Sequence, residues 1–322
     1  MDKLRIKNKI REGQLVLKKY QFRPFSNARG SAVVFEADGL VPQGGLVDRL
    51  KGIISIYYLC KKYGVDTFRI NFTSPFKLED FLIPNNVNWL IRENEISYKY
   101  PSSRPVYRVM ESNPDVLDKV IKRHSGGCRF IYFNMDILKK REKSNHEQIW
   151  RECFHELFKM SPELQREIDA LNIDKEAIAI HTRFVNLFGD FSHYLPGKSG
   201  FAKSVLNEQE REKLISKVCL RIDEIIKNHP NREILFFSDS NYFLGNLPEQ
   251  YREKLRILEG DVQQSEDMSK TGFEAHKKSF IDFMAMSYCN KVIRIEGSGL
   301  YKSAFSKYAA IMGGSEFSVF EI

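Results

Sequence analysis

The sequence predicts an α/β protein built from two Rossmann-like domains that face a central cleft. Short apolar runs, typical of strands buried on both faces, alternate with helical patterns along the chain. This alternation occurs twice, on either side of a break near residues 171–175. The chain has 322 residues, whereas a single hydrophobic core stops growing at about 250–300 residues. We therefore expect one domain over 1–173 and a second over 174–322.

The first half begins with an apolar run that reads as a strand. This run, at 31–36 (SAVVFE), precedes a glycine-rich loop at 39–45 and a helical pattern over Leu46–Lys62. The other elements expected in this half are strands at 65–72, 105–110 and 129–133 and helices at 145–160 and Pro162–Leu171.

The second half shows the same alternation more clearly. The run at 177–181 (AIAIH) is as short and apolar as a strand buried on both faces, and a long amphipathic helix at 207–228 follows it. The remaining expected elements are strands at 233–237 and 291–295 and helices at 275–289 and 301–312. Open parallel sheets bind ligands at the carboxyl ends of their strands. The residues that directly follow these strands are therefore the candidate site.

Positive charge is concentrated at the N-terminus of a chain whose net charge is +8. The basic residues there are Lys3, Arg5, Lys7, Lys9, Arg11, Lys18, Lys19 and Arg23, against only Asp2 and Glu12. Such a segment can contact anionic lipid or an acidic partner, or it can be a solvated surface helix, which we favour. No aromatic or zinc module is interleaved with the basic residues, so nucleic acid is not an expected partner.

Cysteine usage and hydropathy bear on location. The five cysteines are widely spaced and include no C-x-x-C pair, a pattern typical of proteins whose thiols stay reduced. No run of about 18 apolar residues predicts a membrane span, and the first residues lack the apolar segment of a secretory signal. We expect a cytoplasmic protein, peripheral to the inner face of a membrane if the basic segment binds lipid.

Two polar clusters follow expected strands of the second half. His181 and Arg183 follow the apolar residues 177–180 (AIAI), where an arginine can bind a diphosphate through two hydrogen bonds and histidine can contact a base or ribose. Ser238, Asp239 and Ser240 follow the 233–237 run and can contact ribose or base. They can equally cap the next helix, because serine and aspartate are good N-caps.

A glycine-rich turn follows the third strand of this half. Gly297, Ser298 and Gly299 lie between the strand at 291–295 and a helix expected to start near Leu300. Glycines allow close approach of the backbone to a ligand, and a helix N-terminus offers free N–H groups to phosphate. The turn is therefore a candidate phosphate site, with an ordinary tight turn as the alternative.

Asp282 lies within a helix that is apolar almost all round. Such a helix should be buried, and a buried carboxylate needs a partner. Guanine supplies two adjacent donors, N1–H and the 2-amino group, that one carboxylate accepts together. The alternative partner is Lys277 or Lys278, close by on the same helix.

Taken together, these motifs resemble those of the fucosyltransferase superfamily, which includes the α-1,6-fucosyltransferases, the protein O-fucosyltransferases and bacterial relatives. Residues 40–50 (LVPQGGLVDRL) resemble the Gly-Leu-Gly-Asp-Arg-Leu loop, and 181–183 the His-x-Arg motif. Residues 238–240 resemble the Ser-Asp-Ser/Thr motif, and 276–310 the donor-binding segment. The resemblance covers 39–62 and most of 178–313.

The resemblance implies a GT-B fold and an inverting transfer of fucose, or a related sugar, from a GDP-sugar to a glycan or polysaccharide acceptor. It implies no metal and no cofactor, and the sequence contains neither H-E-x-x-H nor D-x-D. It makes 1–173 the acceptor-side domain and 174–322 the domain that binds the nucleotide-sugar.

Residue roles follow by position from the resemblance. Arg183 would bind the β-phosphate, while His181 and Asp282 would read guanine. The other donor-binding candidates are Ser238, Asp239, Ser240, Ser298, Gly299 and Leu300, with Gly44, Gly45 and Arg49 in the loop facing the donor.

Catalysis requires stabilisation of the departing GDP and a base for the acceptor hydroxyl. Arg183 suits the first task. Asp48 and Asp190 are the candidates for the second, and we rank Asp48 first. Either can instead be structural, Asp48 as a helix cap and Asp190 as a turn residue.

Three positions depart from the family pattern: Phe184 follows the His-x-Arg motif, Asn186 stands where aspartate is frequent, and Val47 replaces a glycine. The changes at Val47 and Asn186 leave open a non-catalytic GDP- or glycan-binding domain of the same fold. A transferase of another GDP-sugar, such as GDP-mannose or a GDP-heptose, is a further alternative.

Overall fold

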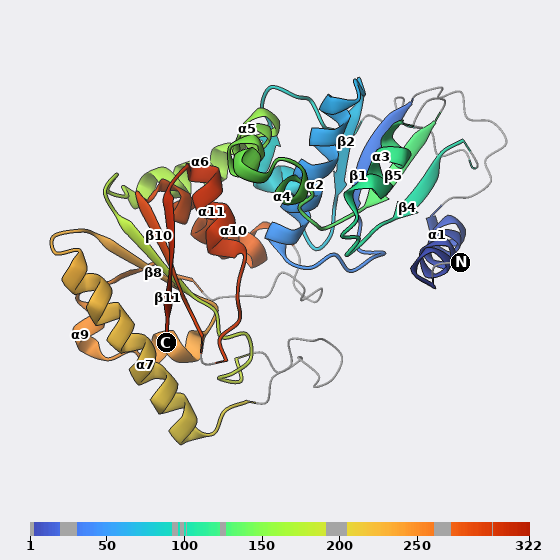
Figure 1. The fold of residues 1–322 in the computed structure, drawn as a ribbon. Coiled ribbons are helices and arrows are strands. Elements are labelled where there is room, and N and C mark those ends of the chain that lie inside the picture. The colour runs from blue at the N-terminus through green and yellow to red at the C-terminus, as the bar shows by residue number, and fades with distance from the viewer. Residues whose placement is uncertain are drawn as a thin grey trace. The chain divides into compact units, whose positions relative to one another are not determined.

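The computed structural model describes residues 3–19, 31–91, 96, 100, 102–122, 127–190, 205–260, 272–297 and 299–322, and it groups into two compact units (Figure 1). Unit 1 runs to Ser161 and takes in a short segment that ends at Phe273, and unit 2 comprises the rest from Pro162. The division thus falls before α6 (Pro162–Leu171) rather than at the expected residue 173. That the units face a central cleft stays a prediction.

Unit 1 is built on a parallel sheet of four strands in the order β2-β1-β5-β4. The strands are β1 (Ala32–Ala37), β2 (Phe68–Phe72), β4 (Arg104–Tyr107) and β5 (Cys128–Tyr132). All six residues of β1 are buried, as expected of a central strand covered on both faces. The sheet order reverses between β1 and β5, whose carboxyl ends therefore form the switch point of this unit.

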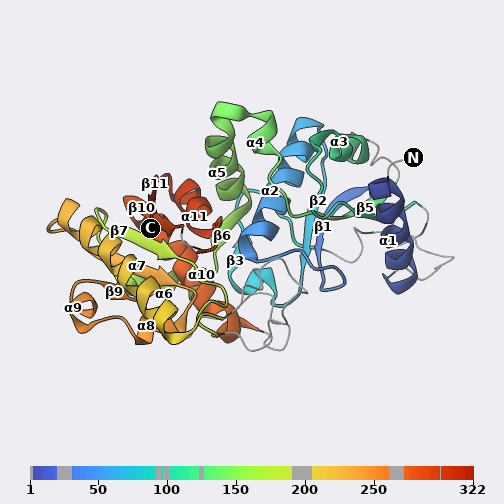
Figure 2. The ribbon, with the colours of Figure 1, turned by 60° about the horizontal axis from the view of Figure 1, so that its bottom comes forward.

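Helices cover both faces of this sheet. α2 (Leu46–Lys62) packs on β1 and β2, and a Cβ at Gly52 would lie 2.1 Å from the Phe133 carbonyl oxygen, so a larger residue there would push helix and sheet apart. α1 (Lys3–Lys19) contacts β4 and lies beside the β4–β5 side of the sheet in both views (Figures 1 and 2). The smaller elements are η1 (Leu78–Asp80), β3 (Leu82–Pro84), α3 (Pro114–Lys122), α4 (Leu138–Arg141), η3 (Lys143–Asn145), α5 (His146–Leu157) and β6 (Phe158–Met160).

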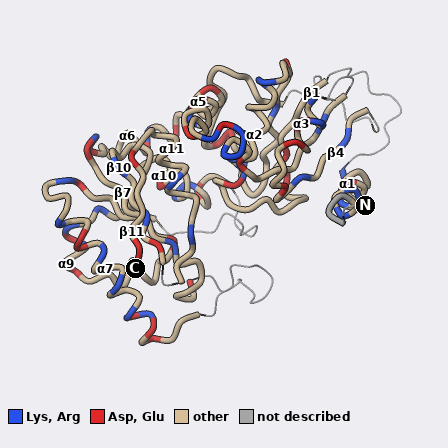
Figure 3. Tube along the Cα trace, viewed as in Figure 1, with Lys and Arg blue, Asp and Glu red and all other residues tan. Residues whose placement is uncertain are grey.

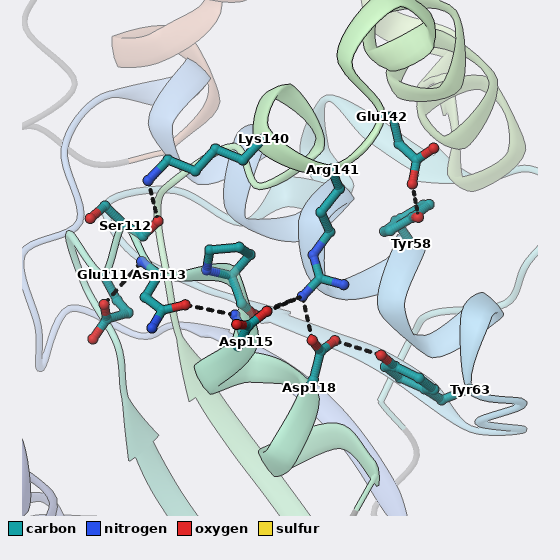
Figure 4. A network of polar contacts seen from close by, with 11 residues as sticks. Tyr58, Tyr63, Glu111, Ser112, Asn113, Asp115, Asp118, Lys140, Arg141 and Glu142 are labelled. Atoms are coloured by element: carbon teal, nitrogen blue, oxygen red, sulfur yellow. Dashed lines mark hydrogen bonds and ion pairs between the residues drawn. The ribbon is translucent and has the colours of Figure 1, made fainter.

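A polar network fastens α3 to its neighbours (Figure 4). The Arg141 guanidinium on α4 donates to the Pro114 carbonyl at 2.9 Å and pairs with Asp118 on α3. Tyr63, directly after α2, donates its hydroxyl to the same carboxylate at 2.7 Å. One carboxylate thus joins three segments that are far apart in sequence.

Unit 2 contains a parallel sheet of five strands in the order β11-β10-β7-β8-β9. The strands are β7 (Ile178–Thr182), β8 (Ile234–Ser238), β9 (Arg256–Ile257), β10 (Lys291–Glu296) and β11 (Glu316–Glu321). In chain order this is the 3-2-1-4-5 arrangement of a doubly wound sheet, with its switch point between β7 and β10. The expected α/β class with parallel sheets is confirmed.

The pleat of these strands gives the two faces of the sheet different chemistry. Ile180 of β7 and Ile293 of β10 belong to the apolar cluster that also contains residues of α7 (Glu208–Asn228). The residues that alternate with them, His181 and Arg294, point to the opposite face. The remaining helices are α8 (Asn241–Gly245), α9 (Glu249–Arg252), α10 (Phe273–Tyr288) and α11 (Phe305–Gly313).

Most predicted elements are present with small shifts. α2 and α6 have the expected bounds, and α7 begins after Asn207, whose side chain forms a capping box with Glu210. The helix expected at 145–160 ends at Leu157, because its last three residues pair with β3. Among the described residues, no helix combines the length and the apolarity needed to cross a membrane.

Candidate functional site

Two of the predicted donor-binding residues, His181 and Arg183, lie at the switch point of the sheet of unit 2. β7 and β10 are neighbours, and Arg294 is the register partner of His181. The residues after both strands, Arg183 and Gly297, therefore leave the same edge of the sheet. In doubly wound sheets this is the edge where a nucleotide binds.

Arg183 is held from two sides by described residues, Asp239 and Tyr301. Its Nε lies 3.4 Å from Asp239 Oδ2, and its guanidinium lies over the Tyr301 ring with 5.0 Å to the centroid. The side chain is 31% exposed. Within the described part of the chain, neither terminal nitrogen donates a hydrogen bond. A planar donor pair fixed in this way suits a phosphate.

Asp239 holds the loop that carries Arg183. Its two carboxylate oxygens accept hydrogen bonds from the backbone N–H groups of Phe184 at 2.7 Å and Val185 at 3.0 Å. Val185 has φ +58°, a left-handed conformation that is strained for a β-branched residue. Burial raises the pKa of Asp239 to about 6, although Arg183 and the two N–H groups act in the other direction. Asp239 thus positions Arg183 through the backbone and through charge.

Asp190 is engaged in organising the start of α8. One of its oxygens accepts from the Ser240 hydroxyl at 2.6 Å and the other from the Tyr242 N–H at 2.8 Å. Ser240 is itself the N-cap, accepting from the Phe243 N–H at 3.0 Å, and Ser238 Oγ accepts from the Ser240 N–H at 3.2 Å. The capping alternative therefore describes Ser240, and a turn role describes Asp190.

His181 is buried and neutral. Burial lowers its pKa to about 3, with smaller contributions from the nearby charges of Arg183 and Arg294. Its ring lies 5.9 Å from the Phe305 ring, centroid to centroid. Its Nδ1 atom is buried without a hydrogen-bond partner among the described residues. A neutral imidazole at this edge can stack on a base or exchange a hydrogen bond with it.

Arg294 and Glu296 are polar residues at this edge that sequence reasoning missed. Arg294 donates to the Ser303 carbonyl at 2.6 Å and forms an ion pair with Glu296. Lys302, which is 76% exposed, approaches the same carboxylate at 3.3 Å. The signal available in sequence was a charged pair inside an otherwise apolar strand. The pair fixes the 300–304 segment beside the sheet and brings a second cation, Lys302, to this edge.

The turn after β10 differs from the expected phosphate-binding arrangement. Gly297 and Gly299 have φ +105° and +91°, values that favour glycine. The Leu300 N–H donates to the Gly297 carbonyl at 2.7 Å, and the Tyr301 N–H donates to the Arg183 carbonyl at 3.0 Å. The helix expected to start near residue 300 begins only at Phe305. The correction matters because the free N–H groups of that helix are not part of this turn.

The second of these bonds ties the 297–301 turn to the loop that carries Arg183. The two candidate phosphate contacts are therefore connected through backbone. Ser298 lies outside the described residues, so its predicted role stays a prediction.

Asp282 has the lysine partner considered as the alternative. Its side chain is 10% exposed, and its Oδ1 lies 2.5 Å from the Lys278 ammonium one turn earlier on α10. Burial raises the pKa of Asp282, and Lys278 opposes that effect. Lys277 pairs instead with Glu167 on α6. A role for Asp282 in reading guanine would require the base to share or replace Lys278, and it stays a prediction.

The predicted donor-facing loop of unit 1 has a defined geometry. Gly44 has φ +81°, and a Cβ there would lie 2.4 Å from Asp48 Oδ2. Gly45 is the N-cap of α2. Asp48, in the first turn, is 41% exposed and pairs with Lys51 at 2.5 Å. Arg49 is buried, donates to the Ser74 carbonyl at 2.6 Å and lies over the Phe72 ring, so its predicted place facing the donor stays a prediction.

No family model matches this sequence, and no curated protein matches it. Several solved structures, in contrast, match the fold of this chain. NodZ alpha-1,6-fucosyltransferase soaked with GDP-fucose is 16% identical and matches 88% of this chain and 92% of its own, with a TM-score of 0.54. Arabidopsis thaliana FUT1, as a mutant in complex with GDP, is 10% identical and matches 95% of this chain and 73% of its own, with a TM-score of 0.56.

These similarities concern the fold. The chain has the fold of these fucosyltransferases, as the resemblance of its motifs led us to expect.

Proposed function

We propose that the chain is an inverting glycosyltransferase that transfers fucose, or a related sugar, from a GDP-sugar to a glycan or polysaccharide acceptor. The carrying observation is Arg183. It stands at the switch point of the sheet, held by Asp239 and Tyr301, with its terminal nitrogens directed to no described residue. The fold shared with fucosyltransferases, one of them determined with GDP-fucose, supports the choice of donor.

In the proposed reaction, the bond between the sugar's anomeric carbon and the β-phosphate oxygen breaks, and GDP leaves with the electron pair. The acceptor oxygen forms the new glycosidic bond from the opposite face, and its proton passes to a carboxylate. Arg183 stabilises the charge that builds on the departing phosphate, an interaction that is stronger in the transition state than before it. The proposed reaction needs no metal.

Asp48 is the better of the two proposed bases. Its carboxylate is 41% exposed and its described contact is the flexible Lys51 side chain. Both oxygens of Asp190 already accept hydrogen bonds that hold the start of α8. We therefore assign Asp190 a positioning role and propose Asp48 as the group that receives the acceptor proton.

The test is a thermal-shift panel with GDP, UDP, ADP and inosine diphosphate, followed by GDP release from GDP-fucose in the presence of EDTA. A ligand at 100 times its Kd stabilises the native state by about 2.7 kcal/mol. We expect GDP to raise the melting temperature and UDP and ADP to leave it unchanged. Inosine diphosphate, which lacks the 2-amino group, should give a smaller shift than GDP if Asp282 reads the base.

Two controls make the panel decisive. Arg183→Ala should lose most of the GDP shift, whereas Arg232→Ala, an exposed arginine paired with Glu176, should keep it. Equal shifts with all nucleotides would contradict the guanine assignment. A GDP shift without any GDP release would favour the non-catalytic alternative, and release from GDP-mannose alone would correct the sugar.

A further inference from the structure

The outer face of α1 carries an unusual set of exposed apolar side chains. Ile6 is 44% exposed, Ile10 58% and Leu17 84%. They are spaced by four and seven residues, so they form one stripe along the helix. Nine large hydrophobic residues are exposed in the described part of the chain, and three of them lie on this single helix. Scattered exposed apolar residues are ordinary, but an aligned group marks a contact surface.

Basic residues border this stripe on both sides. Lys7, Arg11 and Lys18 directly follow the three apolar residues in sequence and form a parallel row on the helix, and Lys9 lies on the other side. All four are exposed. Figure 3 shows the blue of Lys and Arg along α1. The outward face therefore combines apolar side chains with positive charge.

The only acidic residue of α1, Glu12, is turned inward. Its carboxylate accepts from the Tyr107 N–H at 3.0 Å and from the Arg108 guanidinium at 2.6 Å, next to β4. No negative charge of the helix thus offsets the basic rows on its outer face.

The inner face of α1 is fixed to unit 1, which sets the direction of the stripe. Leu15 is buried in a cluster with Val41 and Tyr132. At the end of the helix, Lys19 lies 2.5 Å from Glu36 and 2.9 Å from Asp38. With Glu12 these contacts hold the helix at its middle and its end. The apolar stripe therefore cannot turn inward to join the core without breaking buried ion pairs.

We propose that the outward face of α1 docks the protein onto an anionic membrane surface. An amphipathic helix with an apolar stripe and basic flanks lies in the interface plane, with the apolar side chains below the headgroups and the cations among the anionic ones. A second copy of the chain is a poorer partner, because its own basic rows would meet these rows across the contact. A nucleic acid would pair with the charges but leave the stripe in water.

Docking of this kind places unit 1 against a lipid surface while leaving the donor-binding edge of unit 2 chemically unchanged. The inference does not rest on the proposed transferase activity. It depends only on α1 and its fixed orientation.

The test is sedimentation of the full chain with vesicles of phosphatidylcholine alone or with one-third phosphatidylglycerol. We expect binding to the anionic vesicles, lost at high salt, and little binding to the neutral ones. Lys7→Gln, Arg11→Gln and Lys18→Gln combined should weaken binding by about fivefold for each charge removed. Ile10→Gln with Leu17→Gln should weaken it by more than tenfold, because both side chains leave the lipid.

Matched controls are provided by α7. Leu220, 68% exposed, and the exposed Lys213 lie on a helix outside the proposed surface, so Leu220→Gln and Lys213→Gln should bind vesicles as the unaltered chain does. Melting curves confirm folding of each variant. Equal binding by the α1 and α7 variants, or absence of binding to anionic vesicles, would overturn the proposal. Dimers in light scattering that Leu17→Gln abolishes would identify a second copy as the occupant instead.

Discussion

The two parallel sheets bury charged groups at their carboxyl edges in different ways. In unit 1, Glu36 of β1 is fully buried, and its Oε2 accepts from Lys19 at 2.5 Å and from Asn71 at 2.8 Å. In unit 2, the cation is Arg183, which is 31% exposed and has terminal nitrogens that no described residue accepts from. At the edge of unit 1, Lys19 of the same unit pairs with the buried carboxylate. At the edge of unit 2, Arg183 is held by Asp239, and no described residue accepts from its terminal nitrogens.

This difference shows that a shifted pKa alone does not identify a ligand-binding site. Burial raises the pKa of Glu36 to about 7, against the opposing charge of Lys19, and it raises the pKa of Asp239 to about 6, a change of similar size. A perturbed pKa in itself marks either a functional group or a structural ion pair. Arg183 is accessible, and no described residue accepts from its terminal nitrogens; these two properties make the edge of unit 2 the candidate for a ligand.

The largest effect is expected at Arg183. Arg183→Ala should lower kcat for GDP release by on the order of a hundred-fold or more, the usual cost of losing one strong transition-state contact. Arg183→Lys should restore little, because an ammonium cannot reproduce the planar donor pair. The measurement is the initial rate at saturating donor, with Arg232→Ala as the exposed control. Near-normal turnover by a folded Arg183→Ala variant would break the comparison, since it would make this arginine as structural as Lys19.

The next effect concerns stability at the closed edge. Lys19→Met keeps the length of the side chain but leaves Glu36 and Asp38 without their cation, and breaking a buried ion pair is strongly destabilising. Because Lys19 is 13% exposed, we expect a loss of about 3 kcal/mol in the free energy of unfolding, at the lower end of the usual range. Urea unfolding measures this loss.

The GDP-induced thermal shift serves as the second readout for Lys19→Met and should be retained. Lys51→Met is a matched control, because its partner Asp48 is 41% exposed. A Lys19→Met variant that unfolds normally but no longer responds to GDP would show that the edge of unit 1 is part of the ligand site.

Sequence alone predicted the regular parts of both units, for identifiable reasons. Leu46–Lys62 and Pro162–Leu171 have the expected bounds because a glycine N-cap starts the first and a proline the second. β11 was missed because it lies at the edge of the sheet, where its residues are half-buried or exposed and form no buried apolar run. In addition, β11 begins only three residues after the end of α11, so no long polar or glycine-rich stretch marks the boundary between them in the sequence.

The site was predictable in its location but not in its internal bonds. The motifs at 181–183 and 238–240 placed Arg183 and Asp239 at strand ends, yet the contact between Asp239 and the N–H groups after Arg183 joins residues more than 50 positions apart. The predicted start of α11 near residue 300 was wrong, because Arg294 donates to the Ser303 carbonyl and holds residues 300–304 outside the helix. Both facts depend on which strands are neighbours, which periodicity does not reveal.

The smallest expected effect is a difference in pH dependence between the two edges. For Glu36, the pKa rises from an ordinary 4.5 to about 7 on folding, so the folded chain holds the extra proton between these values. Its contribution to stability is therefore present below pH 4.5 and is lost as the pH rises through 7. For His181, the pKa falls from 6.5 to about 3. Its contribution is present above pH 6.5 and is lost as the pH falls toward 3.

Glu36→Gln and His181→Gln should consequently change the stability profile in opposite directions. Urea midpoints measured from pH 4 to pH 8 should decline less toward high pH in Glu36→Gln and less toward low pH in His181→Gln. Glu249→Gln, at a carboxylate that is 81% exposed, should leave the profile unchanged. If both variants flattened the same limb, one of the two groups would be in the opposite charge state from the one assigned here. If the two variants instead flatten opposite limbs of the stability profile, the result supports a buried carboxyl at Glu36 in unit 1 and a neutral imidazole at His181, beside Arg183, in unit 2.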